Sequence, residues 1–199
     1  MDKVYVIGRD SVPGRFILRA GESLSAVFVV LPGVSCNLHL DVSLEGEGAS
    51  VDLKGVYLSF GDEKVDISVD VQHHSSFSES RQLFKGIASG SARCYFYGRI
   101  LVDEGTRKVK ALQENHNLLL SDGALIQTRP QLEIYADDVE CSHGATIGKL
   151  DENELFYMRS RGIPETEART LQMLSFISPV VAGIRDDGLV EEIYAGLKI

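Results

Sequence analysis

A length of 199 residues is enough for one sizeable hydrophobic core, with or without a small appended unit, and argues against two large domains. The 29 acidic and 20 basic residues give a net charge of -9, which opposes binding to nucleic acid or to an anionic membrane surface. The three cysteines are widely spaced and odd in number, which argues against a disulfide framework and favours a reducing, cytoplasmic environment.

Up to about residue 148 the hydrophobic pattern has a period of two, interrupted by turn residues such as Gly61-Asp62. In the segment 36–44 the even-numbered residues, from Cys36 to Leu44, are apolar and the odd-numbered ones are polar. The even-numbered side chains should therefore face a core. Further strands of this kind are expected in residues 51–53, 56–60, 65–71, 93–102, 108–120, 124–135 and 139–147.

A long series of short strands without intervening helices is typical of a sandwich, a barrel or a parallel β-helix, and periodicity alone does not choose among them. The sequence has no strict hexapeptide repeat, so a solenoid would need irregular rungs. Stacking would bury apolar faces that each strand pair is too small to bury alone.

After Gly148 the hydrophobic period changes to about 3.6, which predicts helices. Asp151, followed by Glu154, is suited to cap a first helix, and Gly162 can end it in a left-handed conformation. Pro164 can open a second helix, which Pro179 bends or ends. The expected buried stripe of this second helix consists of Ala168, Leu171, Leu174 and Ile177. A third helix should begin near Asp186-Asp187, with an apolar stripe that consists of Leu189, Val190, Ile193, Tyr194 and Leu197. The chain is thus expected to comprise a β core, residues 1–149, and a helical region, residues 150–199.

Cys141 and His143 share one parity of a predicted strand, so their side chains should point to the same face, with α-carbons about 6.6 Å apart. Both could reach one soft or borderline metal centre if a partner supplied further ligands. Burial habits favour the alternative of a packed cysteine and a hydrogen-bonded core histidine.

The remaining candidate ligands have no recognisable metal-binding spacing. Adjacent strand residues face opposite ways, so His73 and His74 should not share a metal. Structural or solvated roles are expected for these two residues and for the others, which are Cys36, Cys94, His116 and Asp137-Asp138.

No P-loop, dinucleotide-binding fingerprint, nucleophile elbow or zinc-protease helix is present in the sequence. A hydrolase built on Cys141 and His143 would lack an assignable third group and oxyanion donors. The longest apolar run near the N-terminus, Ala26–Leu31, is far shorter than the roughly 18 residues of a membrane span, and no secretory signal is visible. A soluble, non-enzymatic protein is therefore expected.

Four ordered segments carry a family resemblance, and these are residues 117–122, 127–139, 141–148 and 155–163. From about residue 115 to 180 the chain resembles the SufB/SufD family of iron-sulfur cluster assembly proteins. Within that family the segment Cys-Ser-His-Gly-Ala-Thr, residues 141–146, is similar to the SufD branch, whereas SufB-like members tend to carry Glu-His-Glu-Ala-Thr. Family members usually have a substantial N-terminal region before the strands, whereas this chain begins almost at the strands, as a fragment or a shortened member.

The resemblance implies a mainly β protein with a right-handed parallel β-helix, followed by helices that dock a SufC-like ABC ATPase. It also implies pairing with a SufB-like scaffold subunit, and it places His143 at that interface. His143 is then the candidate ligand for a transient iron ion or iron-sulfur cluster shared with the partner, Cys141 a weaker one, and no permanently bound cofactor is expected. Phe156, Tyr157, Arg159 and Arg161 are the candidate partner-binding residues, although Arg159 and Arg161 are also suited to complement a helix dipole.

Three alternatives remain open from the sequence. The chain is either a subunit of the assembly scaffold or a purely structural β-solenoid that forms a homodimer through its β-helix edges without an ATPase. A thiol hydrolase is the third, weaker alternative.

Overall fold

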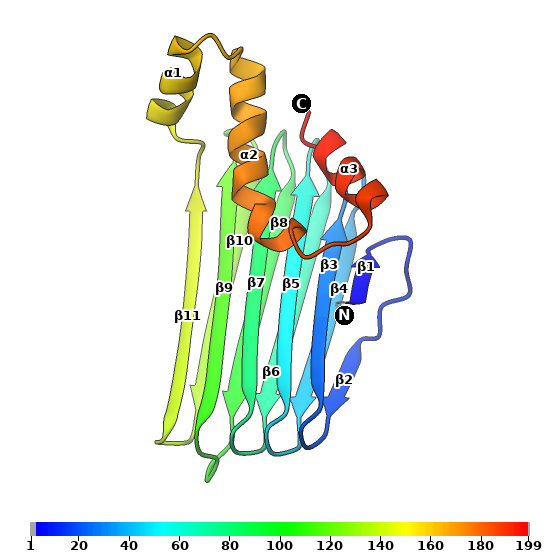
Figure 1. Ribbon diagram of the computed structural model, residues 1–199, viewed down its shortest axis with the longest axis vertical. Coiled ribbons are helices and arrows are strands. Elements are labelled where there is room, and N and C mark those ends of the chain that lie inside the picture. Colours follow the sequence, from blue (N-terminus) through cyan, green and yellow to red (C-terminus); the bar gives the residue numbers. More distant parts are fainter. Residues whose placement is uncertain (1–2, 199) are drawn as a thin grey trace.

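The computed structural model describes residues 3–198, and the alternating segments form two parallel β-sheets that face each other (Figure 1). The odd-numbered strands lie in one sheet, in the order β1-β3-β5-β7-β9-β11, and the even-numbered strands lie in the other, in the order β10-β8-β6-β4-β2. The chain alternates between the sheets, which makes a parallel β-solenoid and confirms the expected fold class. The strands are β1 (Lys3–Val6), β2 (Arg15–Leu18), β3 (Ser23–Val30), β4 (Cys36–Leu44), β5 (Ser50–Ser59), β6 (Lys64–His73), β7 (Glu79–Ala88), β8 (Arg93–Val102), β9 (Val109–Leu119), β10 (Leu125–Ile134) and β11 (Val139–Gly148).

The rungs of the solenoid are irregular in length. Ser23 pairs with Ser50, 27 residues further along, whereas Arg93 pairs with Leu125, 32 residues further along. This variation explains why the sequence shows no strict repeat, because extra residues are accommodated in the turns between strands.

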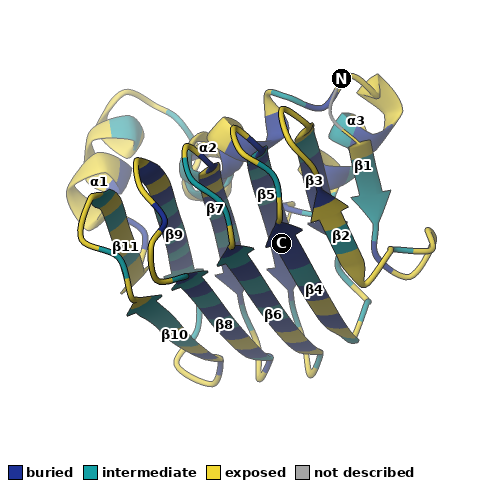
Figure 2. Cartoon of the chain, turned by 90° about the horizontal axis from the view of Figure 1, so that it is seen from below, coloured by how far each residue is buried: buried dark blue, intermediate teal, exposed yellow. Residues whose placement is uncertain are grey.

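The space between the two sheets is filled by alternate apolar side chains from both of them (Figure 2). Leu38, Leu40, Val42 and Leu44 of β4 are buried there, as the pattern predicts. The alternate residues of β6 from Val65 to Val71 are buried in the same way. Burial of this continuous apolar core is the main favourable contribution to the fold.

The odd-numbered sheet is also covered on its outer face, where the helices pack (Figure 1). In β5, Leu53 faces the solenoid interior, whereas Val56 and Leu58 face the helices. The apolar residues of the sequence pattern therefore switch from odd-numbered to even-numbered positions near Gly55, within one strand. The expectation of two separate runs at residues 51–53 and 56–60 was wrong. A strand buried on both faces loses simple alternation.

Three helices follow β11: α1 (Glu152–Ser160), α2 (Glu165–Val181) and α3 (Asp187–Ala195). The Asp151 side chain accepts hydrogen bonds from the backbone N–H groups of Asn153 and Glu154, at 2.8 and 3.1 Å. Gly162 has φ +87°, the left-handed conformation expected after α1. Asp186 caps α3 through the backbone N–H of Leu189, at 3.1 Å. The local signals for the helix ends are thus confirmed, except that α2 continues two residues beyond Pro179.

The buried stripe of α2 differs in part from the predicted one. Ala168 and Ile177 are buried as expected, whereas Leu171 is 41% exposed. Met173, Val180 and Val181 complete the buried face, because α2 lies against β5 and β7. Among residues 3–198, no helix is both long and apolar enough to cross a lipid bilayer.

Candidate functional site

The last rung of the solenoid, formed by β10 and β11, is open on one side (Figure 2). β11 pairs with β9 and β10 pairs with β8, and in the described part of the chain neither has a strand on its other edge. Each of these ten-residue strands therefore presents a row of backbone N–H and C=O groups that another chain could pair with.

Cys141 and His143 both lie on β11 at inward-facing positions, in register with the buried residues Ala111 and Gln113 of β9. The shared parity expected from the sequence is therefore present. Cys141 is partly buried beside a small apolar cluster that includes Val109, whereas His143 is exposed at the open end.

These two residues do not form a complete metal site by themselves. Between residues 3 and 198 there is no group of three or more His, Cys, Asp or Glu side chains placed to hold a metal ion. Burial raises the pKa of the Cys141 thiol, so the protonated form is favoured at neutral pH. The thiolate is the form that binds metals and attacks substrates, so His143 is the more available ligand of the two.

The solenoid interior beneath this rung is polar. Gln82 on β7 and Gln113, Asn115 and Asn117 on β9 are almost completely buried. Asn115 Nδ2 donates to the Tyr57 hydroxyl at 3.2 Å, Asn117 Nδ2 donates to Asn115 Oδ1 at 2.7 Å, and the Tyr57 hydroxyl donates to Asn117 Oδ1. This network was not predicted from the sequence, where its signal is that polar residues occupy the inward-facing positions of β7 and β9.

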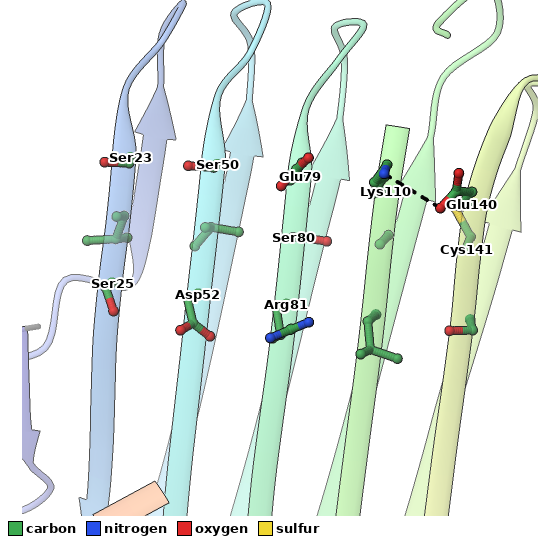
Figure 3. A pocket seen from close by; sticks show the side chains of 15 residues that line it. Ser23, Ser25, Ser50, Asp52, Glu79, Ser80, Arg81, Lys110, Glu140 and Cys141 are labelled. Carbon is green, nitrogen blue, oxygen red and sulfur yellow. Dashed lines mark ion pairs between the residues drawn. The ribbon is translucent and has the colours of Figure 1, made fainter. Parts of the chain in front are cut away.

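A second surface feature is a hollow of about 820 Å³ on the outer face of the odd-numbered sheet, where its strands begin (Figure 3). Rows of residues in register cross it from β3 to β11, with acidic and basic side chains on neighbouring strands. Lys110 Nζ and Glu140 Oε2 are 3.8 Å apart, and both side chains are largely exposed. The labelled lining residues are Ser23, Ser25, Ser50, Asp52, Glu79, Ser80, Arg81, Lys110, Glu140 and Cys141. Because its charges alternate in sign, the hollow has no strong preference for an anion or a cation.

The expected partner-binding residues lie on and just after α1. Phe156 is 73% exposed and Tyr157 is 59% exposed. Tyr157 also lines an apolar hollow of about 650 Å³ between α1, α2 and the end of β9. Arg159 Nη1 lies 3.5 Å from Glu165 Oε2, and the Arg161 guanidinium lies 5.2 Å from the centre of the Tyr157 ring. Both arginines therefore have contacts within the helical region.

The other histidines lie apart from His143. His73 is fully buried and contacts two serine hydroxyls, whereas His74 Nδ1 lies 2.6 Å from Asp103 Oδ2 at the surface. His116 Nδ1 lies 2.9 Å from Thr146 Oγ1 on the outer face of the sheet.

The remaining candidate ligands also have local contacts. Cys94 is buried, and burial raises its pKa to about 11, while Cys36 is partly buried with a raised pKa. Asp138 Oδ1 accepts from Lys108 Nζ at 2.9 Å, so this carboxylate is neutralised by a lysine.

Comparison with known proteins agrees with this geometry. Residues 14–176 match the family model for the SufBD core domain of the SUF system for FeS cluster assembly. The chain is 36% identical over 166 residues to the iron-sulfur cluster assembly protein SufD of Escherichia coli, which covers 83% of this chain and 39% of that protein. It is 33% identical over 156 residues to SufD of Bacillus subtilis, which covers 78% of this chain and 36% of that protein. The chain thus spans less than half the length of these relatives, and it belongs to the SufB/SufD family of iron-sulfur cluster assembly proteins, with similarity to the SufD members.

Proposed function

We propose that this chain supports iron-sulfur cluster assembly as a SufD-like, non-catalytic subunit that pairs with a SufB-like partner through its last rung. The observation that carries the proposal is the unpaired edge of β11, which bears His143. A parallel strand added to that edge would satisfy exposed backbone groups and continue the solenoid into the partner. His143 would then lie at the junction of the two subunits.

The cargo of such a junction is an iron ion or a nascent iron-sulfur cluster. Iron-sulfur clusters are held by thiolates and, in some cases, by imidazole nitrogens. This chain offers the imidazole of His143 and, more weakly, the thiol of Cys141, so the partner subunit would supply the other ligands. Transient, shared binding follows from this incomplete ligand set, and no permanent cofactor is required.

We further propose that α1 and its surroundings contact a SufC-like ABC ATPase. Phe156 and Tyr157 are large apolar side chains that remain exposed beside an apolar hollow. Exposed aromatic side chains of this kind are enriched among the residues that dominate protein interfaces. Nucleotide-driven movement of the ATPase would reach the last rung through the short link between β11 and α1, which spans Lys149 to Asp151.

The experiment is co-expression of the chain with SufB-like and SufC-like subunits, followed by affinity capture and a cluster maturation assay. His143→Ala should leave the complex and the fold intact but lower cluster maturation at least about tenfold, an effect typical of losing a ligand or its support. Ser142→Ala, on the adjacent outward-facing position, is the matched control and should mature clusters normally. Normal maturation by His143→Ala would remove this residue from the mechanism.

The same unpaired edge also favours a second candidate, a homodimer of this chain without an ATPase. Its two β11 strands would pair with each other across a two-fold axis. Measurement of the molecular mass of the chain, alone and with equimolar SufB-like subunit, separates the two. A dimer that persists and never exchanges its partner would support the homodimer, whereas exchange into a heterodimer would support the assembly role.

A further inference from the structure

His143 is the outermost member of a column of side chains that runs into the solenoid. His143 of β11 is in register with Gln113 of β9, and Gln113 is in register with Gln82 of β7. All three occupy inward-facing positions, and both glutamines have no exposed surface. The histidine at the open end is therefore the neighbour of a fully buried amide.

The hydrogen bonds of this column are incomplete. Gln113 Nε2 donates to Gln82 Oε1 at 2.8 Å, but Gln113 Oε1 is buried and has no hydrogen-bond partner in the described part of the chain. A buried acceptor without a partner costs about 1–3 kcal/mol, so native proteins rarely leave one unused. By contrast, Asn117, on the same strand, donates to Asn115 Oδ1 and to the Thr146 carbonyl. Asn115 in turn donates to the Tyr57 hydroxyl and to the Phe84 carbonyl.

The direction of the free oxygen follows from the amide itself. The nitrogen and the oxygen diverge from one carbon atom, so an Nε2 that is directed at β7 leaves Oε1 directed away from β7. β9 lies between β7 and β11, so this is the side on which His143 lies.

Gly98 on the opposite sheet leaves room for the Gln113 amide. A Cβ atom at position 98 would lie 2.3 Å from Gln113 Nε2 and 2.5 Å from Gln113 Oε1, so the amide rests directly against the glycine backbone. The absence of a side chain at this position provides the space that the amide occupies.

We propose that Gln113 is the positioning residue for His143. Its Oε1 accepts a hydrogen bond from one ring N–H of His143 when the imidazole turns toward the interior of the rung. The other ring nitrogen is then unprotonated and faces the open end, which is the form required of a metal ligand. This inference rests on the proposed function only for the identity of the cargo, because the hydrogen bond and the tautomer are properties of the chain itself.

The test is to determine the tautomer of His143 by long-range ¹H–¹⁵N correlation spectroscopy on the ¹⁵N-histidine-labelled chain, at a pH where the ring is neutral. In the parent chain one tautomer should dominate. Gln113→Met keeps the length and volume of the side chain but removes the acceptor, and it should shift the tautomer ratio about fivefold toward the other form, as expected for one hydrogen bond of ordinary net strength. Gln113→Glu keeps an acceptor oxygen and should restore the dominant tautomer.

Asn115→Leu is the matched control. It removes a buried amide from the same strand, but Asn115 is in register with Ala145, not with His143. It should destabilise the chain and leave the His143 tautomer unchanged. If Gln113→Met proves poorly folded, Gln113→Asn, which withdraws the acceptor by one methylene, provides the same readout.

An unchanged tautomer ratio in a folded Gln113 variant would overturn the proposal, and so would an equal change in Asn115→Leu. Neither result would bear on whether His143→Ala impairs cluster maturation. Conversely, normal maturation by His143→Ala would reject the assembly role while leaving the hydrogen bond to Gln113 intact.

Discussion

His73 Nε2 lies 2.8 Å from the hydroxyl oxygen of Ser80, across the turn that joins β6 to β7. Ser78 lies 2.8 Å from the other ring nitrogen and donates its own proton to the Ser75 carbonyl, so the Ser78 oxygen accepts from Nδ1–H. Nε2 must then accept from Ser80, and the neutral imidazole has both of its hydrogen-bonding groups satisfied. Burial, with a smaller contribution from the charge of His74, lowers the pKa of His73 to about 4.

This relationship predicts that the fold loses stability in mild acid. The folded-state pKa lies below the unfolded value of 6.5, so the unfolded chain binds the proton first as the pH falls. The contribution of His73 is complete above pH 6.5 and is lost as the pH falls toward 4. We expect the free energy of unfolding to be about 2 kcal/mol lower at pH 5 than at pH 8 from this residue, measured by urea denaturation.

His73→Gln removes the titration and provides the control, because its stability should depend less on pH over this range. An equal pH dependence in both proteins would contradict the assignment to His73.

Packing of α2 on the outer face of the odd-numbered sheet predicts that alanine substitutions at two positions on α2 differ widely in their effect on stability. Ile177 is fully buried against the sheet, whereas Leu171 is 41% exposed. Ile177→Ala should lower the free energy of unfolding by about 2–5 kcal/mol, because it leaves a cavity, and Leu171→Ala by less than about 1 kcal/mol. Urea denaturation followed by circular dichroism measures both, and similar losses would mean that α2 does not pack as described.

A side chain at position 86, which is a glycine, would clash with the polar network. A Cβ atom there would lie 2.1 Å from the Tyr57 ring and 2.5 Å from Asn117 Oδ1. Gly86→Ala should therefore cost about 1–3 kcal/mol of stability as the network is displaced. Gly144→Ala is the matched control on β11, where a Cβ meets nothing within 4 Å, and it should be neutral or slightly stabilising. Thermal unfolding compares the two, and a tolerant Gly86 would show that the interior is less tightly packed.

Substitutions at two neighbouring residues of α1 should distinguish an effect on stability from an effect on partner binding. Leu155 is 3% exposed and Phe156 is 73% exposed. Leu155→Ala should cost about 2–4 kcal/mol of stability, whereas Phe156→Ala should change stability by less than about 0.5 kcal/mol. If α1 contacts the ATPase, Phe156→Ala should nevertheless weaken capture of the SufC-like subunit. Undiminished capture by this variant would exclude Phe156 from the interface.

The sequence by itself determined the features that depend on neighbouring residues. The alternation in β4 and β6, the cap at Asp151, the start of the third helix near Asp186 and the left-handed Gly162 follow from local backbone and side-chain chemistry, and all of them were predicted. The shared parity of Cys141 and His143 belongs to the same class, since it requires only that the segment is a strand. Sequence similarity to the SufB/SufD family indicated the solenoid, which periodicity alone left open.

Tertiary structure decided what depends on residues about 30 positions apart. β7 was not identified because its inward positions Ser80 and Gln82 are polar. Ser80 is tolerated there because it contacts His73 of β6, and Gln82 because it accepts a hydrogen bond from Gln113 of β9. The parity change in β5 has the same origin, since its outer face is apolar only where α2 covers it. The column from Gln82 through Gln113 to His143 likewise exists only after the strands stack, because the length of each turn sets which side chains become neighbours.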